Sequence, residues 1–295
     1  MTFVSGIGAI DTMIGFPHAD LRASYAEILK QVRDRESHES FEMPVEYMFK
    51  GIPEKGYGAT EDRDPVLHTL EQMDRWGVDV GLVSVGKGDA ADAALARFPT
   101  RFVGSYAPNP NEGVDGVRKI RSAHATFAIR AVTLFPAGFS PQVPIDHRLM
   151  YPIYSVCVEL DLPVFVTVGI PGPRVRGACQ DVGLVDQVMY DFPELVVVLR
   201  HGAQPSEDFA VKLMLKWPNL YYSTSAFSPR YYPAPILDYA NSRGPGKLVY
   251  GGYFPMGLSL ERIMTEMRDV PLKDHVWPGF LRENAARILK VPLHG

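Results

Sequence analysis

Eight short apolar segments recur along the 295 residues, and longer amphipathic segments separate them. The apolar segments are rich in Val, Ile, Leu and Tyr, and most of them lack strict alternation of polar and apolar residues. Such runs are typical of parallel strands that are buried on both faces. The predicted strands span residues 6–11, 78–85, 101–107, 129–135, 163–169, 195–201, 219–225 and 247–252.

The segments between these strands carry helical signals, such as the Asp-Pro start and Gly stop of residues 64–77. Eight strand–helix alternations without a break in composition predict one α/β domain over residues 1–295, a (β/α)8 TIM barrel. A doubly wound sheet is the alternative, but it would more often carry a glycine-rich phosphate turn after its first strand, and "IDTMIGFP" is not such a turn. The predicted helices span residues 64–77, 89–98, 113–125, 146–161, 181–192, 206–217, 231–244, 259–269 and 278–290.

Residues 17–64 interrupt this alternation between the first strand and its helix. A connection of this length in a compact domain usually carries function or structure of its own. We expect residues 21–36 to be helical and the segment "GIPEKGYG", residues 51–58, to form a lid. The sequence therefore predicts a barrel with an insertion after its first strand.

Charge and composition limit the partners of such a barrel. The net charge of −4 argues against nucleic-acid binding, which needs a basic patch. No apolar run is long enough for a transmembrane helix, and the N-terminal residues lack the pattern of a signal peptide. Cys157 and Cys179 form no disulfide framework, which favours a reducing cytoplasm. We expect a cytoplasmic protein with a small-molecule substrate, and the apolar closing segment can pack on its own barrel or in a homo-oligomer.

In a barrel of this kind, catalytic groups lie at the C-terminal ends of the strands. These ends hold one histidine, His201, and one acid, Asp11, rather than a cluster of several His, Asp and Glu residues. Neighbouring side chains on a strand face opposite sides. If His201 faces the pocket, Arg200 is expected to face the helix layer.

Six stretches carry a family resemblance: "AIDTMIGFP", "YPIYSVCVELDLPVFVTVGIPGP", "DFPELVVVLRHGA", "KWPNLYYSTSA", "KLVYGGYFP" and "FLRENAARIL". They are similar to the amidohydrolase superfamily, in the branch that contains aminocarboxymuconate-semialdehyde decarboxylase and related hydrolases. The resemblance covers nearly the whole chain. It implies a TIM barrel whose relatives carry out hydrolysis, decarboxylation or hydration.

The same resemblance implies a divalent metal held by Asp-x-His-x-His on the first strand, a histidine on each of strands 5 and 6, and an acid on strand 8. Of these positions, the present chain keeps Asp11 and His201. The remaining positions hold Met13, Gly15, Thr167 and Tyr253.

Catalytic zinc typically needs three protein ligands from His, Asp, Glu or Cys, and methionine suits soft copper rather than a hydrolytic ion. We therefore predict no family-type metal and no other cofactor.

Three residues are predicted to carry the chemistry. His201 can act as general acid or base near neutral pH, although it can also simply hydrogen-bond neighbouring strands. Asp11 can orient that imidazole, or serve only as a cap in the turn after the first strand. Tyr253 can donate a hydrogen bond to a developing oxyanion, or fill the volume left by the metal.

Substrate contacts are predicted from the loop after strand 5 and from strand 7. Arg174 and Arg176 of "GIPGPRVRGACQ" can clamp an anion, since arginine forks match carboxylates and phosphates, although surface arginines are often only solvated. Tyr222 belongs to an aromatic cluster that suits a flat apolar substrate, but barrel packing explains the cluster equally well. Further substrate contacts are expected from Met13, Thr167, Ser225 and Glu54.

The leading hypothesis is a metal-independent hydrolase, or a related lyase, that acts on a small cyclic organic compound, with an anionic compound suiting the arginines. One alternative is a binding relative that kept the fold and lost the chemistry. Another is a metal-dependent hydrolase or decarboxylase with relocated ligands, in which Asp11 and His201 are joined by His18, Glu42 or Glu54.

Overall fold

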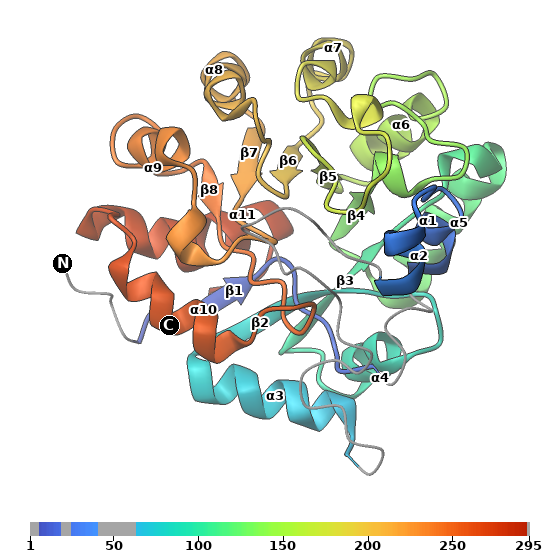
Figure 1. The fold of residues 1–295 in the computed structure, drawn as a ribbon. Coiled ribbons are helices and arrows are strands. Elements are labelled where there is room, and N and C mark those ends of the chain that lie inside the picture. Colours follow the sequence, from blue (N-terminus) through green and yellow to red (C-terminus); the bar gives the residue numbers. More distant parts are fainter. Residues whose placement is uncertain (1–5, 19–24, 41–62, 294–295) are drawn as a thin grey trace.

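The computed structural model describes residues 6–18, 25–40 and 63–293. All eight predicted strands are present, and they pair in parallel and in chain order within one sheet. Figure 1 shows the strands curled into a ring with helices outside it, so the predicted TIM barrel is confirmed. The strands are β1 Ala9–Asp11, β2 Val78–Ser84, β3 Phe102–Tyr106, β4 Ala131–Leu134, β5 Val164–Thr167, β6 Val197–Arg200, β7 Leu220–Ser223 and β8 Leu248–Val249.

The two ends of the sheet meet just beyond β1 and β8. The backbone N–H of Thr12 donates to the carbonyl of Tyr250 at 3.0 Å, and Ile14 forms a parallel bridge with Phe254. β8 is only two residues long, shorter than predicted, because the chain leaves the ladder at Tyr250, whose N–H donates to Phe280 instead of a neighbouring strand. The segment after β8 is thereby fixed beside the end of β1.

The predicted helices are found in their expected places, mostly shorter at their ends. The Asp64 side chain accepts hydrogen bonds from the first turn of α3 (Pro65–Trp76), and Gly77 ends that helix in the left-handed region, as its sequence predicts. Among the described residues, no helix is long and apolar enough to cross a membrane. The helices that follow the insertion are α3 Pro65–Trp76, α4 Ala90–Arg97, α5 Val114–Phe127, α6 Tyr151–Glu159, α7 Leu184–Asp191, α8 Glu207–Lys216, α9 Ala234–Ala240, α10 Leu260–Glu266 and α11 Asn284–Leu289, the last preceded by a π-helical turn, Gly279–Glu283.

The described part of the insertion packs on the barrel. Instead of one helix over residues 21–36, it forms two short ones, α1 (Ala26–Leu29) and α2 (Arg35–Ser40), so the prediction of a single helix is wrong for this part. Ile28 of α1 is buried in a cluster that includes Phe135 and Met256, which follow β4 and β8. The predicted lid at residues 51–58 lies outside the described residues.

Candidate active site

A cavity of about 510 Å³ lies at the C-terminal ends of the strands, where the insertion meets the barrel. Its wall is mainly apolar, and its polar groups come from the strand ends. The described residues that line it are Met13, Tyr25, Glu27, Ile28, Lys87, Ala107, Thr133, Leu134, Phe135, Gly138, Phe139, Thr167, Ile170, Pro171, Gly172, Pro173, Arg200, His201, Tyr253 and Met256.

Both Arg200 and His201 line this cavity, so the expectation that Arg200 faces the helix layer is wrong. The reason is the backbone: β6 ends at Arg200, and His201 has a φ of 63°. Gly202 and Ala203 follow with φ of 96° and 62°. Side-chain alternation holds only while the chain remains extended, and a left-handed residue breaks it.

Gly202→Ala is expected to destabilise the fold by about 2–5 kcal/mol, from left-handed strain and overpacking. A methyl group there would lie 2.1 Å from the Phe227 ring. Gly88→Ala is the matched control, because Gly88 also has a positive φ but no heavy atom within 4 Å of the added carbon. Urea unfolding should show a smaller decrease in the free energy of unfolding for Gly88→Ala, about 1–2 kcal/mol. Equal losses would show that the contact with Phe227 has no effect.

His201 is held from behind by Ser225, whose Oγ lies 3.1 Å from the imidazole Nδ1. The ring of Tyr253 meets the imidazole edge-on, with centroids 5.3 Å apart. Burial, together with the positive charge of Arg200, lowers the pKa of His201 from 6.5 to about 3. The imidazole is therefore neutral at neutral pH, so it can accept a proton but is a weak base in the free protein.

Asp11 is fully buried at the end of β1. Its Oδ1 accepts hydrogen bonds from the N–H groups of Met13 at 2.9 Å and Gly252 at 2.8 Å, which tie β1 to the segment after β8. Burial raises the pKa of Asp11 from 3.8 to about 7, although these two bonds, the Tyr250 hydroxyl and the charge of Arg200 all lower it in part. Asp11 is not among the residues that line the cavity.

The burial of Asp11 predicts a specific pH dependence of stability. Between pH 4 and 7 the folded chain keeps a proton on Asp11 that the unfolded chain releases, so raising the pH disfavours the folded state. Relative to Asp11→Asn, the wild-type free energy of unfolding should fall by at most about 4 kcal/mol across this range. Urea unfolding of both proteins at a series of pH values measures this difference. Parallel curves would contradict the buried, protonated state.

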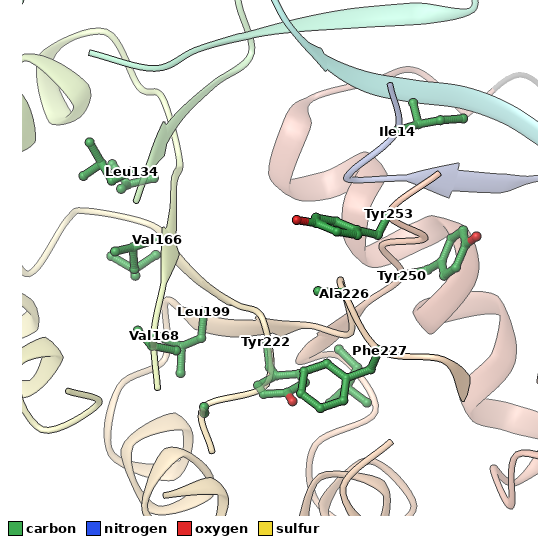
Figure 2. Close-up of a cluster of buried hydrophobic side chains, with 14 of the residues drawn as sticks. Ile14, Leu134, Val166, Val168, Leu199, Tyr222, Ala226, Phe227, Tyr250 and Tyr253 are labelled. Atoms are coloured by element: carbon green, nitrogen blue, oxygen red, sulfur yellow. The ribbon is translucent and has the colours of Figure 1, made fainter. Parts of the chain in front are cut away.

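Tyr253 links three parts of the site. Its φ is 71°, and its N–H donates to the carbonyl of Met13 at 2.8 Å. Its phenol forms a hydrogen bond with Tyr25 of the insertion, and burial raises its pKa, so the hydroxyl stays protonated at neutral pH. Figure 2 shows the side chains of Tyr253 and Tyr250 pointing in opposite directions from the same segment.

Arg200 is 8% exposed and lies on the cavity wall. One of its terminal nitrogens contacts the sulfur of Met13, whereas its buried Nε has no hydrogen-bond partner among the described residues. Burial lowers its pKa from 12.5 to about 10, which leaves it charged at neutral pH. Arg200 is thus a buried cation in the lining of the cavity.

The structure places the predicted substrate-binding residues in different surroundings. Thr167 and Met13 line the cavity, and Thr167 is the register partner of Arg200 across β5 and β6. Tyr222 is fully buried, and its hydroxyl donates to the carbonyl of Gly202. Ser225 lies behind His201 and outside the cavity lining.

Arg174 pairs with Asp34 and Glu36 of the insertion at 2.8 and 2.6 Å. It lines, with Arg176, a separate surface pocket between the insertion and the loop after β5. Glu54 lies outside the described residues.

Sequence reasoning missed Arg200, Lys87 and Tyr25 as lining residues. Lys87 was recognisable because it follows β2 at a strand end. Tyr25 gave no such signal, since it comes from the insertion.

The described residues do not fit the metal that the family resemblance implies. No group of three His, Cys, Asp or Glu side chains within the described ranges is arranged to hold an ion. Asp11 is turned to backbone N–H groups, and the thioether of Met13 contacts a guanidinium. A fixed positive charge repels a divalent cation. This part of the chain therefore lacks both the donors and the electrostatics of such a site.

Comparison with solved structures finds the same fold in other proteins, some of which are enzymes. An uncharacterized TIM-barrel protein from Bordetella bronchiseptica is 20% identical, with a TM-score of 0.70, 96% of this chain and 98% of that chain covered. A 5-carboxyvanillate decarboxylase from Novosphingobium aromaticivorans, complexed with manganese and 4-hydroxy-3-methoxy-5-nitrobenzoic acid, is 14% identical, with a TM-score of 0.63 and 97% and 96% covered. A 2,6-dihydroxybenzoate decarboxylase from Rhizobium is 12% identical, with a TM-score of 0.61 and 96% and 99% covered.

No curated protein gives a significant match. A family model described as amidohydrolase matches residues 15–291, which is most of the chain. The chain therefore belongs to the amidohydrolase family.

Proposed function

We propose that this protein is a metal-independent hydrolase of a small cyclic organic compound, with His201 as the group that moves the proton. The observation that carries the proposal is a neutral imidazole on the wall of an apolar cavity whose described residues lack a set of metal ligands. The cavity of about 510 Å³ has the size expected of a small-molecule site.

In this mechanism His201 takes a proton from water as the water adds to a carbonyl carbon, and later returns it to the leaving oxygen or nitrogen. Ser225 fixes the ring through Nδ1, so the other nitrogen is the one available to water. The protonated phenol of Tyr253 donates a hydrogen bond to the oxygen that becomes negative. Asp11 supports the turn that carries Met13 and Gly252 rather than contacting substrate.

Decarboxylation is the second candidate, because solved neighbours are decarboxylases of aromatic acids and an apolar cavity favours loss of a charged carboxylate as CO2. That reaction needs an acid that delivers a proton to carbon. Asp11 is half-protonated near pH 7, but it lies behind the cavity wall. Hydrolysis needs a base and a hydrogen-bond donor, and the residues proposed for these roles, His201 and Tyr253, both line the cavity.

Turnover in water labelled with oxygen-18 tests the proposal. A panel of lactones, cyclic amides and hydroxybenzoates is incubated with the full chain after dialysis against a chelator, and products are weighed by mass spectrometry. We expect a ring-opened product that carries one labelled oxygen, and we expect His201→Gln not to form it. A product lighter by CO2 would favour decarboxylation, and activity only after metal addition would overturn metal independence.

A further inference from the structure

A guanidinium without a carboxylate partner among the described residues lines the cavity. Arg200 is more than nine-tenths buried, and no acidic side chain among the described residues lies within salt-bridge distance of it. The acids that do pair with arginines lie elsewhere, as Glu266 does with Arg230 and Arg262. Asp11 acts on Arg200 only as a nearby charge and forms no ion pair with it.

Part of the hydrogen-bonding capacity of this guanidinium is also unused. A guanidinium carries five N–H donors and no acceptor. Its contact with the Met13 sulfur is a weak one, and Nε has no acceptor within the described ranges. A buried charge is unfavourable unless it is paired and hydrogen-bonded. Because this one faces a cavity, a ligand can supply the missing anion.

The surroundings of Arg200 indicate the class of anion. One buried cation neutralises one negative charge, and the guanidinium fork matches a planar carboxylate. Much of the remaining lining is apolar, including Leu134, Phe135, Phe139 and Ile170. A phosphate dianion would need further buried donors. A hydrophobic ring with one carboxylate needs none, because the ring can pack on the apolar lining while the carboxylate pairs with Arg200.

We propose that the cavity binds a small hydrophobic monocarboxylate whose carboxylate pairs with Arg200, so that a fixed guanidinium supplies the positive charge among the positions where the family resemblance places metal ligands. Met13, Thr167 and Tyr253 line the same cavity as Arg200. The inference deepens the proposed function by naming the substrate class. It also bears on the reaction, because an ion pair stabilises the carboxylate and disfavours its loss as CO2.

Binding of benzoate and of its neutral analogue benzamide to the full chain tests this inference without any turnover. By ligand-observed NMR titration, wild type should prefer benzoate by about 10- to 100-fold, the range for a hydrogen bond to a charged group. Arg200→Met should abolish this preference and retain benzamide binding, which also shows that the variant is folded. Arg200→Lys should keep part of the preference, because it keeps the charge but not the fork.

Equal binding of the two probes by wild type, or no binding of benzoate, would overturn the inference. So would a benzoate preference that survives in Arg200→Met. Failure here leaves a hydrolase of neutral compounds intact, whereas benzoate binding without any labelled product would preserve the inference and reject the proposed function.

Discussion

Replacing His201 with Gln is expected to lower kcat by about 10²- to 10⁴-fold, the usual contribution of a general acid or base. Glutamine retains a hydrogen-bonding side chain of similar size but cannot exchange a proton near neutral pH. The left-handed backbone at this position, with φ of 63°, is present in wild type and tolerates a non-glycine residue. Steady-state kinetics on the substrate found with labelled water, with circular dichroism to confirm folding, measure the effect.

Ser225→Ala provides the matched comparison. Ser225 does not line the cavity, and its Oγ holds the imidazole at 3.1 Å, so it is a positioning residue. Its loss should lower kcat less than the loss of His201, with little change in KM. A His201→Gln variant with wild-type turnover would contradict the mechanism. A Ser225→Ala defect as large as that of His201→Gln would show that Ser225 does more than orient the ring.

The pH profile of kcat/KM carries an independent signature of His201. Burial and Arg200 lower the pKa of its imidazole to about 3, so the neutral form persists far below pH 6.5. In an Asp11→Asn background, which removes the group that titrates near pH 7, kcat/KM should not fall as the pH is lowered from 8 to about 5. A loss of activity centred near pH 6.5 would indicate an exposed, ordinary histidine.

Arg200→Met is expected to raise the free energy of unfolding by about 1–4 kcal/mol, the range seen when buried charges are replaced by packed hydrophobic residues. The guanidinium is largely buried, and its Nε has no partner among the described residues to offset that burial. Its pKa, lowered by burial, reports the same unfavourable environment. A gain in stability together with a loss of binding is expected where a residue that binds the ligand destabilises the folded protein.

Chemical denaturation of wild type, Arg200→Met and Arg200→Lys measures this effect at neutral pH. The free energy of unfolding should rise less in Arg200→Lys than in Arg200→Met, because lysine keeps a buried charge. Release of the lysine proton would reduce this difference. A clear destabilisation by Arg200→Met would contradict the account, because it would mean that the guanidinium stabilises the fold. Added benzoate should stabilise wild type more than the methionine variant.

Much of the fold could be predicted because its signals are local. Each strand is an apolar run, and α3 is bounded by Asp64 and Gly77, which cap it in the structure as their residue types indicate. The insertion could not be predicted in the same way. Its helix α1 is only four residues long and is fixed by packing of Ile28 on residues far along the chain, so short-range periodicity does not reveal it.

The site was predictable only where side-chain direction follows from strand ends. Thr167, the last residue of β5, lines the cavity for that reason, and His201 and Tyr253 line it from the turns after β6 and β8. Arg200 was assigned to the wrong side because the alternation of β6 stops at a left-handed residue, which the sequence does not mark when that residue is a histidine. The pairing of Arg174 with Asp34 was also hidden, since it joins residues 140 apart.

Elemental analysis of the purified full chain tests the central claim most directly. The protein is prepared without chelators, incubated with zinc or manganese and freed of loose ions by gel filtration, and turnover is measured before and after chelation. We expect far less than one ion per chain and unchanged turnover, because Arg200 supplies the positive charge of the site. One tightly bound ion per chain, lost together with activity and restored with it, would contradict the account.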